Sequence, residues 1–115
     1  MIIRYSIHPE HIKRMTTDEL RDAFLLDSLF KEDTIELIYS EVDRAIVGSA
    51  VPINNNLSLV ASKKEMGVDY FTERRELGVI NIGEKGSIIL DENEYSLEKE
   101  DMLYIGRETR NIIFK

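Results

Sequence analysis

The first side chains able to bind a metal ion lie near the amino terminus. His8 and His11 flank Glu10, so two imidazoles and a carboxylate stand close together along the chain. A zinc ion needs at least three well-placed protein ligands, and the sequence offers the two histidines no clear third partner. We interpret the segment around Pro9 as solvated, with His11 starting or capping a turn.

The densest charged cluster is Glu73-Arg74-Arg75-Glu76. One interpretation is that an arginine binds the carboxylate of a ligand, because its planar guanidinium donates two parallel hydrogen bonds to such a group. The other is a set of surface or interdomain ion pairs, because each arginine has a glutamate beside it. We prefer the ion pairs and leave open whether Arg74 or Arg75 touches a ligand.

The other polar groups are expected to be structural or solvated. General acid–base catalysis needs a group with a shifted pKa in a cleft, and no sequence feature indicates one. We therefore assign no catalytic or metal-ligating residue and leave the substrate-binding residues unknown. Gly83-x-x-Gly86 is too short and too acidic for a phosphate loop. The expected roles are core or barrel lining for Tyr39 and Tyr104, a turn ion pair for Asp43-Arg44, and solvated turns for Asp91, Glu92, Glu98 and Glu100.

The elements that would position these groups change character after residue 33. Thr16 and Glu19 can form a capping box, and Leu20 and Phe24 give the following residues one apolar stripe, so a short helix is expected there. From Thr34 onward, short apolar runs alternate with turn residues. The expected strands are IELIYS, AIVGSAVPI, LSLVA, LGVINI, SIILD, EYSL, MLYIG and NIIF.

This pattern predicts a mainly β fold, with residues 1–33 as a helical or irregular preface and 34–115 as an antiparallel sandwich or barrel. Residues 1–115 are expected to form a single domain. The last residues, 111–115, read as a strand with nothing after it to cover an edge, so we expect the protein to continue. An unpaired final strand could also pair with another chain, which would suit an interaction domain.

The composition limits which classes of molecule the protein is expected to bind and where in the cell it is expected to lie. The 115 residues carry a net charge of -7, from 22 acidic and 15 basic residues. This charge disfavours nucleic acid and anionic membranes. With no cysteine, disulfides and thiolate metal sites are ruled out. The opening MIIRY is too short for a signal peptide and no apolar run is long enough to span a bilayer, so a cytoplasmic protein is expected.

The order of strands and turns from Gly78 to Phe114 resembles a cupin, a small antiparallel barrel of the jelly-roll type. Gly83 and Gly86 are expected to take the positive φ values of tight turns. Asp101 stands where cupins often have Gly-Asp, with Glu100 in place of the glycine.

Three segments resemble one family in particular, 5-keto-4-deoxyuronate isomerase, also called 4-deoxy-L-threo-5-hexosulose-uronate ketol-isomerase. They are YSIHPEHIKRMTTDELRDAFLLDSLF, IYSEVDRAIVGSAVPI and GVDYFTERRELGVINIG, and the ERRELGVINIG run is the strongest part. The resemblance implies two cupin halves in a homohexamer, a zinc ion bound in the carboxy-terminal half, and isomerisation of a 5-keto-4-deoxyuronate to a 2,5-diketo acid in pectin or uronate catabolism. This chain would be the amino-terminal half.

A metal-binding cupin places His-x-His, a Glu and a later His inside its barrel. Aligned through the ERR run, this chain has Tyr70 and Thr72 in the first two positions, Leu77 in the Glu position, and Arg110 or Asn111 near the last. None of these side chains is a good zinc ligand. We therefore expect a degenerate, metal-free cupin that is inactive alone and whose partner is the carboxy-terminal half. The alternative is a free-standing, metal-free cupin that binds a small acid or a protein partner, with its pocket inside the barrel.

Overall fold

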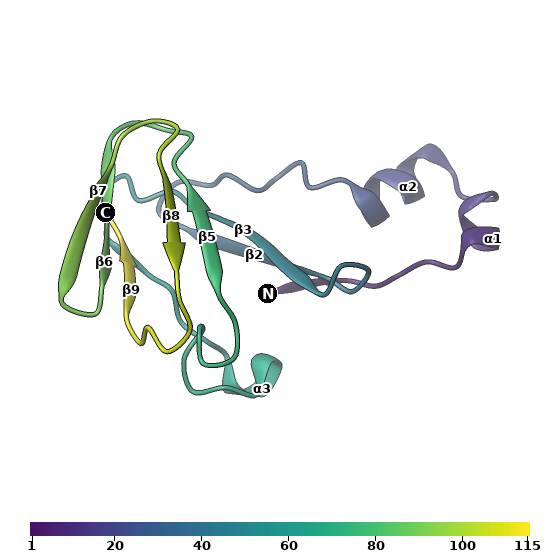
Figure 1. Ribbon diagram of the computed structural model, residues 1–115. Coiled ribbons are helices and arrows are strands. Elements are labelled where there is room, and N and C mark those ends of the chain that lie inside the picture. Colours follow the sequence, from purple (N-terminus) through teal and green to yellow (C-terminus); the bar gives the residue numbers. More distant parts are fainter.

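The structure, a computed structural model, describes residues 1–115 and is mainly β (Figure 1). The strands are β1 (Ile2–Arg4), β2 (Ile35–Ser40), β3 (Ala45–Ala50), β4 (Leu57–Ser58), β5 (Leu77–Ile80), β6 (Gly86–Leu90), β7 (Asn93–Leu97), β8 (Met102–Ile105) and β9 (Ile112–Phe114). The helices are α1 (Pro9–Ile12), α2 (Thr17–Phe24) and α3 (Lys63–Met66). The strands form three sheets, ordered β1-β2-β3, β4-β9-β6-β7 and β5-β8, so they do not close into one barrel.

The first sheet combines a hairpin with a strand that the sequence did not predict. Strands β2 and β3 pair antiparallel from Ile35 opposite Ala50 to Ser40 opposite Ala45. β1 then pairs with β2 in parallel, although its residues fall in the segment expected to be helical or irregular. A three-residue strand leaves little periodic signal, and its pairing is determined by a partner more than 30 residues away.

The other two sheets share the hydrophobic core. In β5, Leu77 and Val79 face inward, while Gly78 and Ile80 are exposed, which is the alternation of a strand buried on one face. Residues of β5 and β8 thereby pack against β6, β7 and β9. The core cluster consists of Leu59, Phe71, Ile88, Leu97, Ile105 and Ile112.

The final strand is not an edge. β9 lies between β4 and β6 and pairs antiparallel with both, and Ile112 is among the most buried residues. The expectation of an unpaired last strand is therefore wrong, and it no longer supports an interaction domain. The strand is central because β4 and β6, which lie far apart in sequence, supply its two neighbours.

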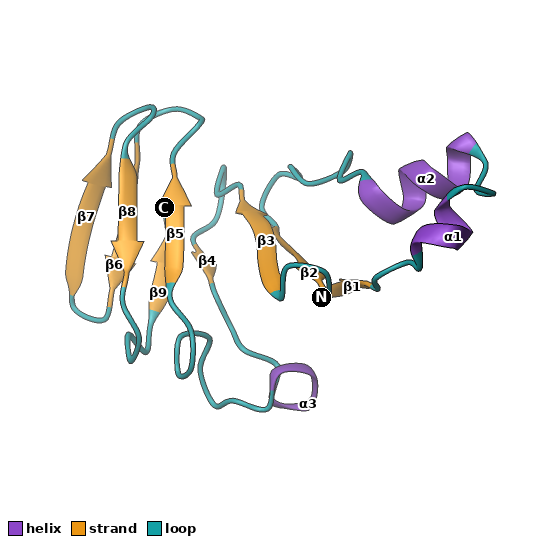
Figure 2. Cartoon of the chain, turned by 45° about the vertical axis from the view of Figure 1, so that its right-hand side comes forward, coloured by secondary structure: helices purple, strands orange, loops and turns teal.

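The amino-terminal helices extend away from the sheets (Figures 1 and 2). Thr16 caps α2 by accepting from the amide of Glu19, and the Glu19 carboxylate accepts from the amide of Thr16, so the predicted capping box is confirmed. No residue of α1 or α2 is buried. The radius of gyration of 15.9 Å exceeds the value of about 13 Å for a compact domain of this size.

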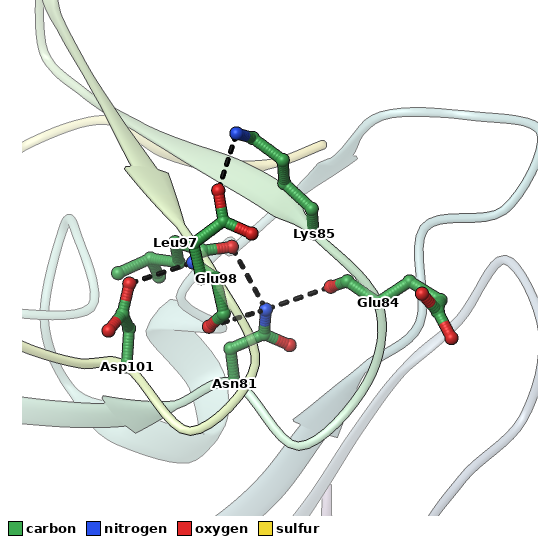
Figure 3. Close-up of polar contacts among 6 residues, drawn as sticks. All are labelled: Asn81, Glu84, Lys85, Leu97, Glu98 and Asp101. Atoms are coloured by element: carbon green, nitrogen blue, oxygen red, sulfur yellow. Dashed lines mark hydrogen bonds and ion pairs between the residues drawn. The ribbon is translucent and has the colours of Figure 1, made fainter.

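The turns around β6 depend on Asn81, which joins three segments (Figure 3). Its Nδ2 donates to the carbonyls of Glu84, Leu97 and Glu98 at 2.8, 3.1 and 3.2 Å, and its Oδ1 accepts from the amide of Gly83 at 3.1 Å. The side chain is thus saturated with structural hydrogen bonds. It fastens the end of β5 to the beginning of β6 and the end of β7.

The glycine predictions for this region are wrong in detail. Neither Gly83 nor Gly86 has a positive φ; the one glycine that does is Gly67, after α3. Gly86 is required by a close approach instead, because a Cβ there would lie 2.7 Å from the carbonyl oxygen of Lys115. Glu100, which occupies the expected glycine position before Asp101, has a φ of 70°. It therefore adopts the left-handed conformation that glycine favours.

Candidate functional site

Three of the four positions aligned with cupin metal ligands come together in space. The guanidinium of Arg110 lies 5.1 Å from the centre of the Tyr70 ring. Thr72 is fully buried, and its hydroxyl donates to the carbonyl of Thr109, the residue before Arg110. Leu77 opens β5 and packs against the core. The alignment thus groups residues that are neighbours in the fold.

The setting of these residues differs from the expected one. Tyr70 and Thr72 lie in the loop between α3 and β5, not in a strand, so strand alternation does not orient their side chains. The amides of Arg110 and Asn111 both donate to the carboxylate of Asp91, at 3.0 and 2.9 Å. Residues 1–115 contain no group of three or more His, Cys, Asp or Glu side chains placed to hold a metal ion. Contacts within the chain therefore hold Tyr70, Thr72 and Arg110 in place.

In the charged cluster at residues 73–76, one arginine forms an ion pair and the other does not. Glu73 accepts from the amide of Asp69 at 2.7 Å and lies 3.6 Å from Nε of the exposed Arg74. The ion-pair interpretation is therefore confirmed for Arg74. It is wrong for Arg75, which has no carboxylate within 4.0 Å and no hydrogen-bond partner for its buried Nε. Arg75 instead lies over the ring of Phe71, 5.6 Å from its centre.

The two tyrosines expected in the core lie in different surroundings. Tyr104 is 67% exposed on the outer face of β8, so its predicted burial is wrong. A hydrogen bond to the Glu76 carboxylate stabilises the protonated hydroxyl and raises the pKa of Tyr104. Tyr39 is half-buried and lines an open cleft of about 360 Å³ together with Arg75.

This cleft is not the expected interior pocket. It lies between the sheet of β1, β2 and β3 and the segment that carries α3 and Arg75, and no residue of β5 or β8 lines it. A second cleft, of about 520 Å³, has no hydrophobic residue in its lining, which comes from Lys85, β6, β7 and Lys115. The inward side chains of LGVINI and MLYIG pack into the core cluster.

The other residues predicted in turns lie in turns or beside helix ends, but several of their partners differ from those expected. His8, rather than His11, caps α1, with its Nδ1 accepting from the amide of Glu10 at 3.2 Å, and Glu10 pairs with Lys13. Asp43 and Arg44 lie in the turn after β2 but form no ion pair; Asp43 accepts from Ser40 instead. Glu98 pairs with Lys85 at the surface. Asp91 is exposed, yet the two amides described above make it structural.

One acid that the sequence did not single out has a strongly shifted pKa. Hydrogen bonds from the side chain and the amide of Asn54, and from the amides of Asn55 and Ile53, lower the pKa of Asp33 to about 2. The Asn54-Asn55-Asn56 run marked a turn, but its acceptor lies some 20 residues earlier. Because every contact is to the chain itself, Asp33 fastens this turn rather than binding a ligand.

No family model matches the chain, but individual proteins do. A 4-deoxy-L-threo-5-hexosulose-uronate ketol-isomerase of Lachnoclostridium phytofermentans is 48% identical over 114 residues, which cover 99% of this chain and 41% of that protein. Proteins of the same name from Bacillus subtilis and Escherichia coli O9:H4 are 45% and 43% identical, over 96% and 99% of this chain.

The chain spans about two-fifths of the length of these relatives. None of its helices has the length and apolar character to cross a membrane. At such identity over nearly the whole chain, the resemblance inferred from ERRELGVINIG and its neighbouring segments is confirmed. The chain is a homologue of the amino-terminal part of the 4-deoxy-L-threo-5-hexosulose-uronate ketol-isomerases.

Proposed function

We propose that this chain is the amino-terminal half of a uronate ketol-isomerase. The enzyme would convert 5-dehydro-4-deoxy-D-glucuronate to 3-deoxy-D-glycero-2,5-hexodiulosonate, in the cytoplasm, during pectin or uronate catabolism. The observation that carries the proposal is the 43–48% identity to proteins named for this activity, over 96–99% of the chain.

In this proposal the chain supplies no catalytic group. Moving a carbonyl between neighbouring carbons requires a base and an electrophile that stabilises the enediolate, and a zinc ion supplies the electrophile when it is bound. The residues present do not fit zinc: the aligned positions hold Tyr70, Thr72, Leu77 and Arg110 or Asn111. The contact between Tyr70 and Arg110 and the hydrogen bond from Thr72 to the carbonyl of Thr109 support a structural role. The zinc ligands would lie in the carboxy-terminal half.

We also propose that the β region is a degenerate cupin of the jelly-roll type. Two antiparallel sheets that face a shared core support this assignment, as does the contact between Tyr70 and Arg110, which stand in aligned positions far apart in sequence. The same fold would recur in the second half and carry the metal.

The outer face of β5 and β8 suits packing against the rest of such an enzyme. Ile80, Met102 and Tyr104 point outward there and are 56, 73 and 67% exposed. In the register, Gly78 lies opposite Tyr104 and Ile80 opposite Met102, so these side chains form one continuous apolar face. The partners would be the carboxy-terminal half and neighbouring subunits of a homohexamer.

The test compares the isolated 115-residue chain with the native protein. We expect the isolated chain to show no isomerase turnover and no stoichiometric zinc by elemental analysis. The native protein should be more than twice the 13.3 kDa of this chain, contain zinc, and lose activity to a chelator. Metal-dependent turnover by the isolated chain would overturn the assignment of catalysis to the other half.

A second candidate is a free-standing, metal-free cupin that binds a small acid or a protein partner. The unpaired Arg75 in its cleft favours this candidate. Intact mass separates the two: a native mass near 13.3 kDa would leave the binding module, and a mass more than twice as large would support the isomerase.

A further inference from the structure

The cleft beside Arg75 contains a cation whose charge no neighbour neutralises. Arg75 lies over Phe71, and that ring covers one face of the guanidinium. Its Nε is shielded from solvent yet has no hydrogen-bond partner. Because Nε is closed to solvent, an acceptor from outside the chain would have to reach the guanidinium through the part of Arg75 that lines the cleft.

The two acids that line the cleft already have partners. Glu41 accepts from the amide and the hydroxyl of Ser6, both at 2.8 Å, and these bonds lower the pKa of its carboxyl. Glu65 lies 3.6 Å from the amino-terminal ammonium. Neither acid is within ion-pair distance of Arg75. The bonds from Ser6 favour the ionised form of Glu41, and both acids keep lone pairs free to accept further hydrogen bonds.

The rest of the lining is apolar and aromatic. Tyr39 and Tyr5 present rings and hydroxyls, and Ile46 and Met66 form part of the apolar wall. A volume of about 360 Å³ falls at the small end of the range for ligand sites, roughly 300–1,000 Å³. The cleft therefore has space for a molecule of sugar size, with one cation that has no ion-pair partner, carboxyl oxygens that can accept from hydroxyls, and rings against which a sugar face can pack.

We propose that this cleft binds a small hydroxy acid, with its carboxylate on the guanidinium of Arg75 and its hydroxyls donating to Glu41 and neighbouring groups. Arginine donors match a carboxylate in a planar, two-bond geometry. A monoanion suits the cleft better than a phosphate, because Glu41 and Glu65 repel a second negative charge. The proposal goes beyond the isomerase assignment and stands even if that assignment fails.

The experiment titrates the purified protein with sodium D-glucuronate and follows methyl and amide resonances by NMR. D-glucose, which has a similar ring and hydroxyls but no carboxylate, is the matched ligand control. D-glucose 6-phosphate tests the preference for a monoanion. We expect glucuronate to shift resonances of Ile46, Met66 and Tyr39, and to bind at least about tenfold more tightly than either other compound.

The matched protein control lies in the same motif. We expect Arg75→Gln to weaken glucuronate binding about tenfold or more and Arg75→Lys to give an intermediate loss, while Arg74→Gln leaves binding unchanged. Equal binding of glucuronate and glucose would overturn the proposal, as would wild-type affinity in Arg75→Gln. Shifts confined to residues outside the cleft, or no binding by the wild-type protein, would also overturn it, whether or not the variants fold.

Discussion

Arg110 packs its guanidinium 5.1 Å from the centre of the Tyr70 ring, so a residue just before the last strand contacts the loop that precedes β5. In the cupin alignment these residues occupy two of the ligand positions. The pair joins distant parts of the chain by a cation–π contact.

This contact predicts a measurable coupling. In a double-mutant cycle of Tyr70→Leu and Arg110→Gln, we expect a coupling of about 0.5–1 kcal/mol in the free energy of unfolding, which is typical of an exposed cation–π pair. Urea denaturation of the four proteins measures it. Tyr70→Phe serves as control, because it keeps the ring and should keep most of the coupling; additive single effects would contradict the contact.

Removing the side-chain amide of Asn81 is expected to lower the stability of the protein markedly. Replacing Asn81 by Ala removes all three Nδ2 hydrogen bonds and leaves the part-buried carbonyl of Leu97 without that donor. We expect the free energy of unfolding to fall by about 2 kcal/mol, measured by denaturant titration. Asn56→Ala, an exposed change with no side-chain hydrogen bond to lose, should be nearly neutral. Similar effects of the two changes would show that the turns do not depend on Asn81.

Glu100 predicts a stabilising substitution. An L residue at φ 70° is strained by about 1–2 kcal/mol, and glycine is free of that strain at a smaller entropic cost. We expect Glu100→Gly to raise the thermal midpoint, with a gain of roughly 0.5–1 kcal/mol. Lys99→Gly, at the adjacent residue without a positive φ, should lower the thermal midpoint.

Conversely, Gly67→Ala should lower the free energy of unfolding by about 1 kcal/mol, because Gly67 has a φ of 64°.

Asp33 predicts how stability depends on pH. Hydrogen bonds, those from Asn54 foremost, lower its pKa in the folded protein to about 2 from an ordinary 3.8. The unfolded chain therefore binds a proton first as the pH falls. The stabilisation by Asp33 should be complete above about pH 4 and lost as the pH approaches 2.

The check is a comparison of wild type with Asp33→Asn. We expect the variant to be less stable at pH 7 and the difference in thermal midpoint to shrink as the pH falls from 4 to 2. An NMR titration of the Asp33 carboxyl carbon measures the pKa directly. A midpoint near 3.8 in the folded protein, or a stability difference that does not vary with pH, would contradict this account.

Local sequence patterns predict those features of the fold that depend on residues close together along the chain. The helix after Thr16 was predicted because its capping box joins residues three apart, and the strand at IELIYS appears within the predicted bounds. The family was also evident from sequence, because homology is carried by local motifs such as ERRELGVINIG. A mainly β fold followed from the spacing of apolar runs and turns.

Which segments become neighbours depends on long-range packing, which local sequence does not specify. That packing placed β9 in the centre of a sheet and β1 beside β2, where periodicity predicted an edge and an irregular preface. It also decided charge pairing: Arg74 and Arg75 each have an adjacent glutamate, yet only Arg74 is paired. Neighbouring residues do not determine the direction of a side chain, because burial against Phe71 and the first sheet depends on contacts made across the whole fold.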